Sequence, residues 1–193
     1  MVLDTETTGI PITAGFNKYY HPKELKYYDS ARLVELGYII YDDKGKEIKT
    51  VSHIVSPNNF SIDNWKIHGI TNEIAAEEGI DINTVFDEFS KDLDNIDSII
   101  GHNITFDMNV LLSEFYRHKK NELIDKFKNI NVICTMKIGK VIMKQYKYPK
   151  LIELYSFLFN EVCNQEHRAL SDVIICAKCF FYITENKLIV FDK

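Results

Sequence analysis

Two carboxylates stand two residues apart near the start of the chain, at Asp4 and Glu6. The run Met1–Asp4 predicts a short strand, and side chains two residues apart on an extended chain leave the same face. Two like charges so close together are costly unless a cation lies between them. The pair therefore indicates a metal site, with two solvated acids at a strand end as the alternative. Thr7 and Thr8 follow directly and add small hydroxyl groups.

Two further acids stand in motifs at the ends of predicted elements. In the string GHNITFD a short apolar strand ends and Asp107 opens a helix, where capping that helix is the alternative role for the acid. In the string HRALSD, His167 and Asp172 would diverge by roughly 140° on one ideal helix. Both side chains can face one site only if His167 lies in the loop before the helix.

Taken together, the strings VLDTETTG, GHNITFD and HRALSD resemble the three motifs of the DEDDh 3′–5′ exonucleases, the DnaQ-like family. Two more strings also fit that family, IHGIT at 67–71 and KYPKLIELYSFLF at 147–159. One branch of the family has a tyrosine four residues before the last acid. Arg168 stands at that position here and His167 precedes it, so the chain resembles the histidine branch.

The resemblance implies an α/β fold, an RNase H-like mixed five-stranded sheet flanked by helices. It implies an enzyme that releases nucleoside monophosphates from nucleic-acid 3′ ends by a two-metal mechanism. The family's acidic tetrad holds two Mg²⁺ or Mn²⁺ ions, and it corresponds here to Asp4, Glu6, Asp107 and Asp172. His167 corresponds to the general base that takes the proton of the attacking water, and histidine is the side chain that titrates near neutral pH.

Candidate contacts to the terminal nucleotide stand beside these motifs. Phe106 is a candidate for stacking on a base or sugar, with core packing as the alternative. His68 and Ile70 resemble a substrate-contact segment of the family, although the same string also suits a turn before a helix. The full set of candidate contacts is Thr7, Thr8, His68, Ile70, Asn103 and Phe106.

Two other functions remain as alternatives at this point. The DxET string is superficially similar to the phosphotransferases of the haloacid dehalogenase type, which need a second aspartate where Glu6 stands. That alternative leaves GHNITFD and HRALSD unexplained. A non-catalytic nucleic-acid-binding module on the same fold is the second alternative, and the complete set of five polar residues argues against it.

The elements that would position these residues follow from the apolar periodicity. Strands and helices alternate after an initial hairpin, which favours an α/β fold with a mixed sheet. Predicted strands cover Met1–Asp4, Leu33–Tyr41, Glu47–Val55, Ser98–Gly101 and Val132–Cys134. Predicted helices cover Thr71–Gly79, Thr84–Leu93, Phe106–His118, Thr135–Met143, Lys150–Phe159 and Leu170–Thr184. The segment from Pro11 to Ser30 is predicted to be a long loop.

Composition limits the classes of protein that fit. With 193 residues and 46% hydrophobic content, the chain is expected to form one exonuclease domain over 1–193, with motifs at 2–9, 101–107 and 167–172. No apolar run reaches the ~18 residues of a membrane span, and no secretory signal opens the chain, so we expect an intracellular, cytoplasmic protein. The net charge is −5. Bound metal ions would let such an acidic protein hold DNA or RNA 3′ ends, single strands in preference to duplexes. A homodimer or a polymerase partner is left open.

Two lysine-containing segments are further candidates for binding single strands. One is KYYHPKELKYY at 18–28, in which the paired tyrosines either stack bases or pack on the domain. The other holds Lys137, Lys140, Lys144, Lys147 and Lys150, for which an ordinary solvated surface is the alternative. Cys176 and Cys179 lie in an apolar helical run and are predicted to pack in the core rather than bind metal.

Overall fold

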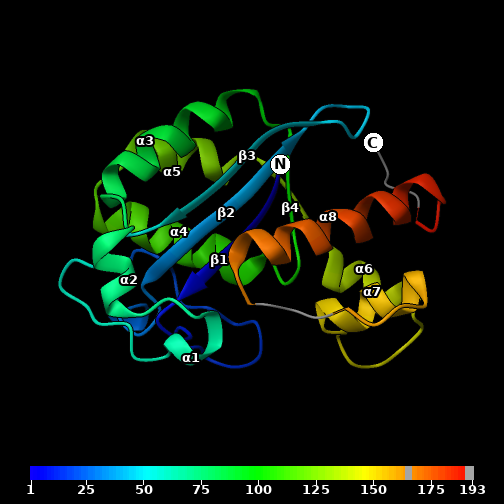
Figure 1. Ribbon diagram of the computed structural model, residues 1–193, viewed down its shortest axis with the longest axis horizontal. Helices are drawn as coiled ribbons and strands as arrows, with labels where there is room; N and C mark the ends of the chain where they lie inside the picture. The colour runs from blue at the N-terminus through cyan, green and yellow to red at the C-terminus, as the bar shows by residue number, and fades with distance from the viewer. Residues whose placement is uncertain (164–166, 190–193) are drawn as a thin grey trace.

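The chain folds around one mixed β-sheet (Figure 1). The computed structural model describes residues 1–163 and 167–189. Within them the strands are β1 (Val2–Thr7), β2 (Leu33–Tyr41), β3 (Glu47–Ile54), β4 (Ser98–Gly101) and β5 (Asn131–Cys134). They lie in the order β3-β2-β1-β4-β5, with β1, β2 and β3 antiparallel and β4 parallel to both β1 and β5. The predicted mixed five-stranded α/β sheet is confirmed.

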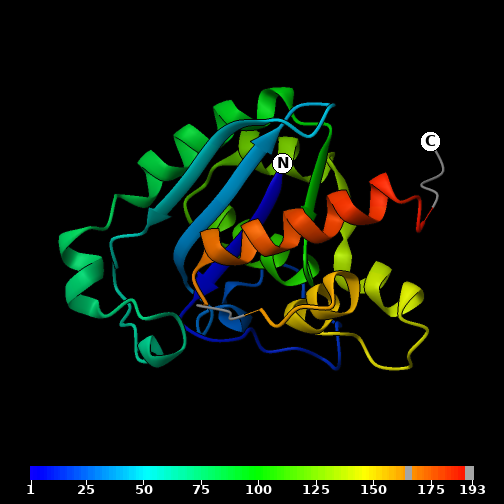
Figure 2. The same ribbon diagram turned by 45° about the vertical axis from the view of Figure 1, so that its right-hand side comes forward.

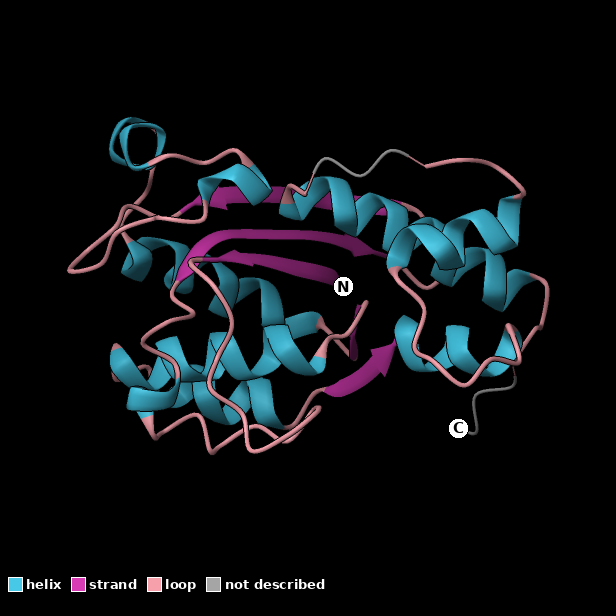
Figure 3. Ribbon diagram, turned by 90° about the horizontal axis from the view of Figure 1, so that it is seen from below, coloured by secondary structure: helices cyan, strands magenta, loops and turns pink. Residues whose placement is uncertain are grey.

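Helices cover both faces of the sheet, as the view from below shows (Figure 3). The helices are α1 (Trp65–His68), α2 (Asn72–Glu77), α3 (Ile82–Asp92), α4 (Thr105–Arg117), α5 (Asn121–Lys128), α6 (Thr135–Ile142), α7 (Leu151–Phe159) and α8 (Ala169–Glu185). Helices α3, α4 and α5 enclose one core, and α6, α7 and α8 enclose a second. Among the described residues, no helix combines the length and the apolar character that crossing a membrane requires.

Strand β1 contributes to both cores, because successive side chains on a strand point to opposite faces. Val2 packs in the core under α8, whereas Leu3 packs in the core under α3, α4 and α5. By the same alternation Asp4 and Glu6 point toward the α8 layer, and Thr5 points toward the α4 layer. The end of β1 therefore presents its two acids to one helical layer and Thr5 to the other.

Helix α8 approaches the sheet closely at Gly37 of β2, and it crosses the sheet face in the turned view (Figure 2). A Cβ atom at Gly37 would lie 2.8 Å from the carbonyl carbon of Ala169 and from the amide nitrogen of Leu170. Gly37 is opposite Asp4 in the β1–β2 register. The missing side chain therefore allows the first turn of α8 to lie beside the acidic end of β1.

The prediction was incomplete at three elements, the strand β1 and the helices α1 and α5. The first strand was predicted to end at Asp4, but pairing with β2 continues to Thr7 and extends β1. The helix α5 was not predicted, although the spacing of Leu123, Ile124 and Phe127 is helical and all three side chains are buried. The predicted β2–β3 hairpin and the helices that carry Asp107 and Asp172 are confirmed.

Candidate active site

Three carboxylates from two elements meet beside the end of β1. Asp4 and Glu6 come from the strand, and Asp172 comes from the first turn of α8. One oxygen atom of each side chain lies within 4.8 Å of the other two. Asp172 is buried, and Asp4 and Glu6 are half-buried. The predicted placement of both strand acids on one face is therefore confirmed, and that face is the one that α8 covers.

Asp107 reaches the same region from the opposite layer, at the edge of β1. The register of β1 with β4 contains only the pair Val2 and Ile100, so β4 does not accompany the rest of the strand. The Thr5 amide donates to Asp107 Oδ1 at 3.0 Å, and the Thr5 hydroxyl donates to the same oxygen at 2.7 Å. A buried amide needs an acceptor, and this carboxylate replaces the missing strand partner.

Burial and mutual repulsion make these acids hard to ionise. Burial raises the pKa of Asp4 well above its ordinary value, and the charges of Asp107 and Asp172 raise it further. Burial, followed by the charge of Asp172, raises the pKa of Glu6 to about 8. Burial also raises the pKa of Asp107 to about 7, although hydrogen bonds from Thr5 oppose the rise. A bound proton or a bound cation would relieve this cost.

The donor set fits a hard divalent cation. Asp4, Glu6 and Asp172 offer only carboxylate oxygens, which are the ligands that Mg²⁺ and Mn²⁺ prefer. Arg168 lies near enough to lower the pKa of Glu6, but its guanidinium is already bound to Glu35. A divalent cation bound to these carboxylates would neutralise the charge of the cluster.

His167 lies outside α8, in the loop just before it. Its backbone φ of 50° is in the left-handed region, and its side chain is exposed. The condition that His167 must precede the helix to share a site with Asp172 is met. Residues 164–166, just before it, lie outside the described residues.

A family model described as exonuclease, the RNase T model, matches residues 1–180. The chain belongs to this exonuclease family. Comparison with curated proteins by sequence gives no significant match.

Solved structures of exonucleases share the fold of this domain. Exonuclease X in complex with 5′ overhanging duplex DNA is 22% identical, with a TM-score of 0.62 over 96% of this chain and 92% of that one. E. coli exonuclease I in complex with a dA16 oligonucleotide is 16% identical, with a TM-score of 0.71 over 97% of this chain. Exonuclease I from Methylocaldum szegediense is 18% identical, also with a TM-score of 0.71 over 97% of this chain. The exonuclease domain spans 41% of each of these two exonuclease I chains. The predicted membership in an exonuclease family is confirmed by the family model, and the solved exonuclease structures confirm the predicted fold.

A buried ion pair fastens α8 of the exonuclease domain to β2, and the sequence did not predict it. Glu35 is fully buried, opposite Glu6 in the β1–β2 register. Its carboxylate accepts from Arg168 Nη2 at 2.7 Å, from the Ala169 amide at 3.0 Å and from the Ser52 hydroxyl at 2.9 Å. Burial would raise the pKa of Glu35, but these hydrogen bonds hold it below its ordinary value.

Breaking this pair should destabilise the exonuclease domain and misplace the first turn of α8. Removing one partner of a fully buried pair costs ~3–5 kcal/mol, and we expect about 2–3 kcal/mol for Arg168→Gln, because water reaches the guanidinium. Urea unfolding measures this change, and Glu35→Gln/Arg168→Gln should recover part of it. A Mg²⁺ affinity that falls in Arg168→Gln and recovers in Arg168→Lys would indicate that Arg168 positions the first turn of α8. An unchanged free energy of unfolding in Arg168→Gln would contradict the assignment.

The raised pKa values predict how stability depends on pH in a chelating buffer. A carboxyl whose pKa is higher in the folded than in the unfolded state binds more protons when folded, so stability falls as pH rises. The melting temperature should therefore decrease between pH ~4.5, where unfolded carboxyls titrate, and pH 8, the pKa of Glu6. Saturating Mg²⁺ or Mn²⁺ should reverse the decrease at the alkaline end. Differential scanning fluorimetry tests this, and equal curves with and without cation would contradict it.

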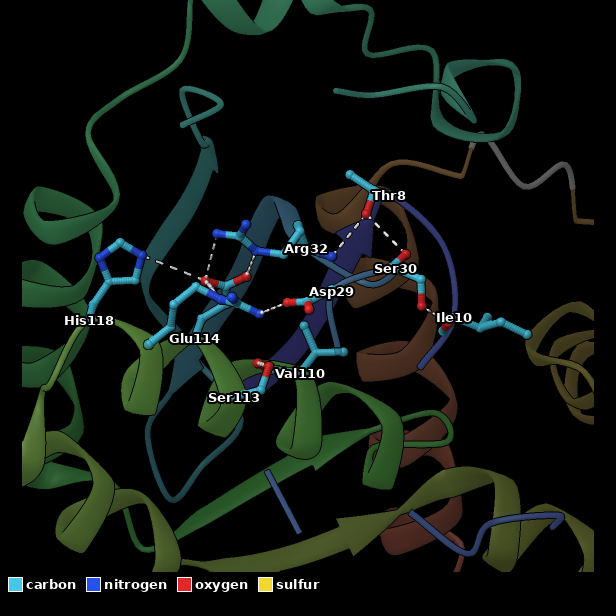
Figure 4. Close-up of polar contacts among 10 residues, drawn as sticks. Thr8, Ile10, Asp29, Ser30, Arg32, Val110, Ser113, Glu114 and His118 are labelled. Atoms are coloured by element: carbon cyan, nitrogen blue, oxygen red, sulfur yellow. Dashed lines mark hydrogen bonds and ion pairs between the residues drawn. The ribbon is translucent and has the colours of Figure 1, made fainter. Parts of the chain in front are cut away.

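Thr7 and Thr8 fix the end of β1 through contacts within the protein. The Thr7 hydroxyl donates to the Gly9 carbonyl at 2.6 Å. The Thr8 hydroxyl donates to the Ser30 carbonyl and accepts from the Arg32 amide, as the close-up shows (Figure 4). Contacts of these threonines with a terminal nucleotide stay a prediction.

The same close-up shows how the other side of the loop is held (Figure 4). The Arg32 guanidinium pairs with the buried Glu114 of α4 at 2.5 Å. Arg117, one turn further along, pairs with Asp29 at 2.8 Å. The loop after β1 is therefore fastened to α4 where it returns to the sheet.

His68 and Ile70 are buried rather than displayed at the surface. Nδ1 of His68 accepts from the Ile70 amide at 3.2 Å, and burial lowers the pKa of the imidazole. Ile70 packs in a small cluster with Val34 and Ile62. Neither side chain offers surface to a nucleotide in this structure, and their contacts with substrate stay a prediction.

Asn103 lies in the loop between β4 and α4, and Phe106 lies in the first turn of α4, beside Asp107. Asn103 has a left-handed φ of 64°, and its buried side-chain oxygen accepts no hydrogen bond from the described residues. Phe106 is half-buried at the start of α4. A buried acceptor without a donor is costly and points to a ligand or water at this position.

The tyrosine pairs of the long loop pack on each other and on the domain. Tyr20 and Tyr27 stack with ring centroids 3.8 Å apart, and the buried Tyr28 donates to the Tyr20 carbonyl at 2.6 Å. Of the packing and base-stacking alternatives, these contacts favour packing.

Cys176 and Cys179 are buried in the core under α8, as predicted.

Proposed function

We propose that this exonuclease domain degrades nucleic acid from the 3′ end and releases nucleoside monophosphates. The observation that carries the proposal is the meeting of Asp4, Glu6 and Asp172, with oxygens within 4.8 Å, in a chain of the exonuclease family. Exonuclease X and exonuclease I, whose fold it shares, are solved in complex with DNA. Their ligands support DNA as one substrate class, and RNA is the other candidate.

The four acids are proposed to bind the metal ions in two ways, three directly and one through water. Mg²⁺ or Mn²⁺, bound as a pair, would neutralise the phosphate and activate the attacking water. Asp4, Glu6 and Asp172 are the proposed direct ligands, because their oxygens converge. Asp107 already accepts two hydrogen bonds from Thr5, so it is proposed to act through a water molecule.

His167 is the proposed general base, which accepts the proton of the attacking water. Its position just before α8 supports this role, because the same helix carries Asp172. The exposed imidazole is free to turn toward a bound phosphodiester. Neutral imidazole accepts a proton and imidazolium does not, so His167 would work in its neutral form.

Recognition of the 3′ terminus is proposed to lie on the α4 side of the acids. Phe106 offers a ring that can pack on a base or sugar without regard to sequence. The unpartnered Oδ1 of Asn103 supports a polar ligand contact beside it. The substrate would then extend away from the acids over neighbouring surface.

Labelled single- and double-stranded DNA and RNA, incubated with Mg²⁺ or Mn²⁺, test the proposal. We expect a 3′ label to appear first as a mononucleotide, and a 5′-labelled strand to shorten progressively. Chelation should stop both. Release of mononucleotides from the 5′ end, or binding without turnover, would overturn the proposed polarity or the activity. Hydrolysis of p-nitrophenyl phosphate alone would favour the phosphatase alternative.

A further inference from the structure

A block of positive charge lies next to the acidic site of this acidic chain. Residues 129–152 hold five lysines and no aspartate or glutamate, although the whole chain carries a net charge of −5. This stretch forms β5, α6 and the α6–α7 loop. Its charge is therefore opposite to that of the protein as a whole and to that of the neighbouring acids.

Most of these lysines have no carboxylate partner among the described residues. In the residues that the structure describes, no carboxylate forms an ion pair with Lys137, Lys140 or Lys144, whereas Lys147 pairs with Glu153 at 2.9 Å. The Lys140 ammonium instead lies 4.6 Å from the centre of the Tyr148 ring. Three cations thus remain available for a polyanion.

Aromatic rings are exposed among these lysines. Phe16, from the loop after β1, is 75% exposed and stacks on Tyr148 with centroids 5.7 Å apart and ring planes 22° from parallel. Tyr146 is fully exposed in the α6–α7 loop. Exposed aromatic faces cost free energy in water, and nucleic-acid bases are ligands that cover them.

Contacts at the end of β4 place this surface beside the acids. His102 Nε2 lies 2.9 Å from the Pro149 carbonyl, and Nδ1 lies 3.0 Å from the Thr135 hydroxyl. Lys137 lines a hollow of about 510 Å³ together with Thr105, which is the first residue of α4 and two residues before Asp107.

We propose that this lysine–aromatic surface binds the single-stranded segment that leads to the 3′ terminus. The surface consists of Phe16, Lys137, Lys140, Lys144, Tyr146 and Tyr148. The rings stack unpaired bases and the lysines meet the phosphates, a combination typical of single-strand binding. Base-paired DNA hides its base faces, so the rings favour a single strand over a duplex. The inference rests on the proposed function for the direction of the strand.

Three lysine substitutions test the electrostatic part of the proposal. Lys137→Gln/Lys140→Gln/Lys144→Gln is compared with Lys44→Gln/Lys46→Gln/Lys91→Gln, whose lysines are exposed on the β2–β3 turn and on α3. Binding of a 20-nucleotide oligothymidylate is followed by anisotropy between 25 and 200 mM salt, in an Asp4→Asn background. Each phosphate-bound lysine contributes ~0.7 to the slope of log K against log salt, so the slope should fall by about 2 in the first triple variant only.

The rings are tested separately by Phe16→Ser/Tyr146→Ser. Binding should weaken by about 5- to 150-fold for each base that loses its stack, with an unchanged salt slope, because no charge is removed. With Asp4 intact, both variants should raise KM for the oligonucleotide while kcat for thymidine 5′-monophosphate p-nitrophenyl ester stays at the wild-type value.

Equal salt slopes in the two triple variants would overturn this inference, because they would show that Lys137, Lys140 and Lys144 do not contact the phosphates of the strand. A loss of hydrolysis of the small ester equal to that of the oligonucleotide would also overturn it. If the wild-type protein releases no nucleotide from any nucleic acid, the proposed activity fails. The binding comparison in the Asp4→Asn background still decides this surface independently.

Discussion

Replacing Asp4 by asparagine is expected to lower nucleic-acid hydrolysis by about 10³-fold or more, the upper end of the cost of removing one electrostatic stabiliser. Asp4 is the acid that the charges of Asp107, Asp172 and Glu6 all affect, so it stands at the centre of the cluster. Asparagine keeps the shape of the side chain but offers a weaker, neutral ligand. Initial rates with saturating Mn²⁺ measure the change.

The same variant should be at least as stable as the wild type in chelating buffer at pH 8. Burial and four neighbouring acids raise the pKa of Asp4, so its charged form destabilises the fold above neutral pH, and asparagine removes that charge. The rise in melting temperature on adding Mg²⁺ should shrink. Wild-type turnover in a folded Asp4→Asn protein would contradict the metal-ligand assignment.

Substituting His167 by glutamine is expected to lower the rate by on the order of 10²–10⁴-fold, the usual contribution of a general base. Glutamine cannot take up a proton near neutral pH, so the variant should lose the part of the pH dependence that comes from imidazole. Because the imidazole works unprotonated, the wild-type rate should fall toward acidic pH. Rates from pH 5 to 9 on a single-stranded oligonucleotide measure both effects.

Metal occupancy must be held constant in that experiment, because protons compete with cations for Glu6 and Asp107, whose pKa values are about 8 and about 7. Saturating Mn²⁺ at each pH achieves this, and an acidic limb that persists in His167→Gln then belongs to the carboxylates. His53→Gln, on β3 and paired with Glu88, is the matched control. An unchanged rate and pH profile in His167→Gln would remove His167 from the mechanism.

Local sequence was sufficient to predict which residues form the candidate site and which face of its strand or helix each side chain leaves. The alternation of a strand places Asp4 and Glu6 on one face, and the divergence of His167 and Asp172 on an ideal helix requires the loop that the structure has. Motif spacing was enough to predict the family and the sheet, because both depend on short strings and on hydrophobic period.

Other features depend on contacts between distant segments, which no local pattern encodes. The hydrogen bonds from Thr5 to Asp107 exist because β4 does not accompany the full length of β1. The ion pair of Glu35 with Arg168 joins residues 133 positions apart, and only the packing of α8 on the sheet brings them together.

Tertiary packing also decided which candidates face solvent. The string around Ile70 suits a surface segment as well as a buried one, and the cluster with Ile62 buries it. Tyr20 and Tyr27 of the long loop stack on each other, so these ring faces are covered within the protein. Sequence period fixes the direction of a side chain relative to its own element, whereas burial and raised pKa values depend on which other elements pack against that face. The close approach of α8 at Gly37 is the contact that turned separate acids into one site.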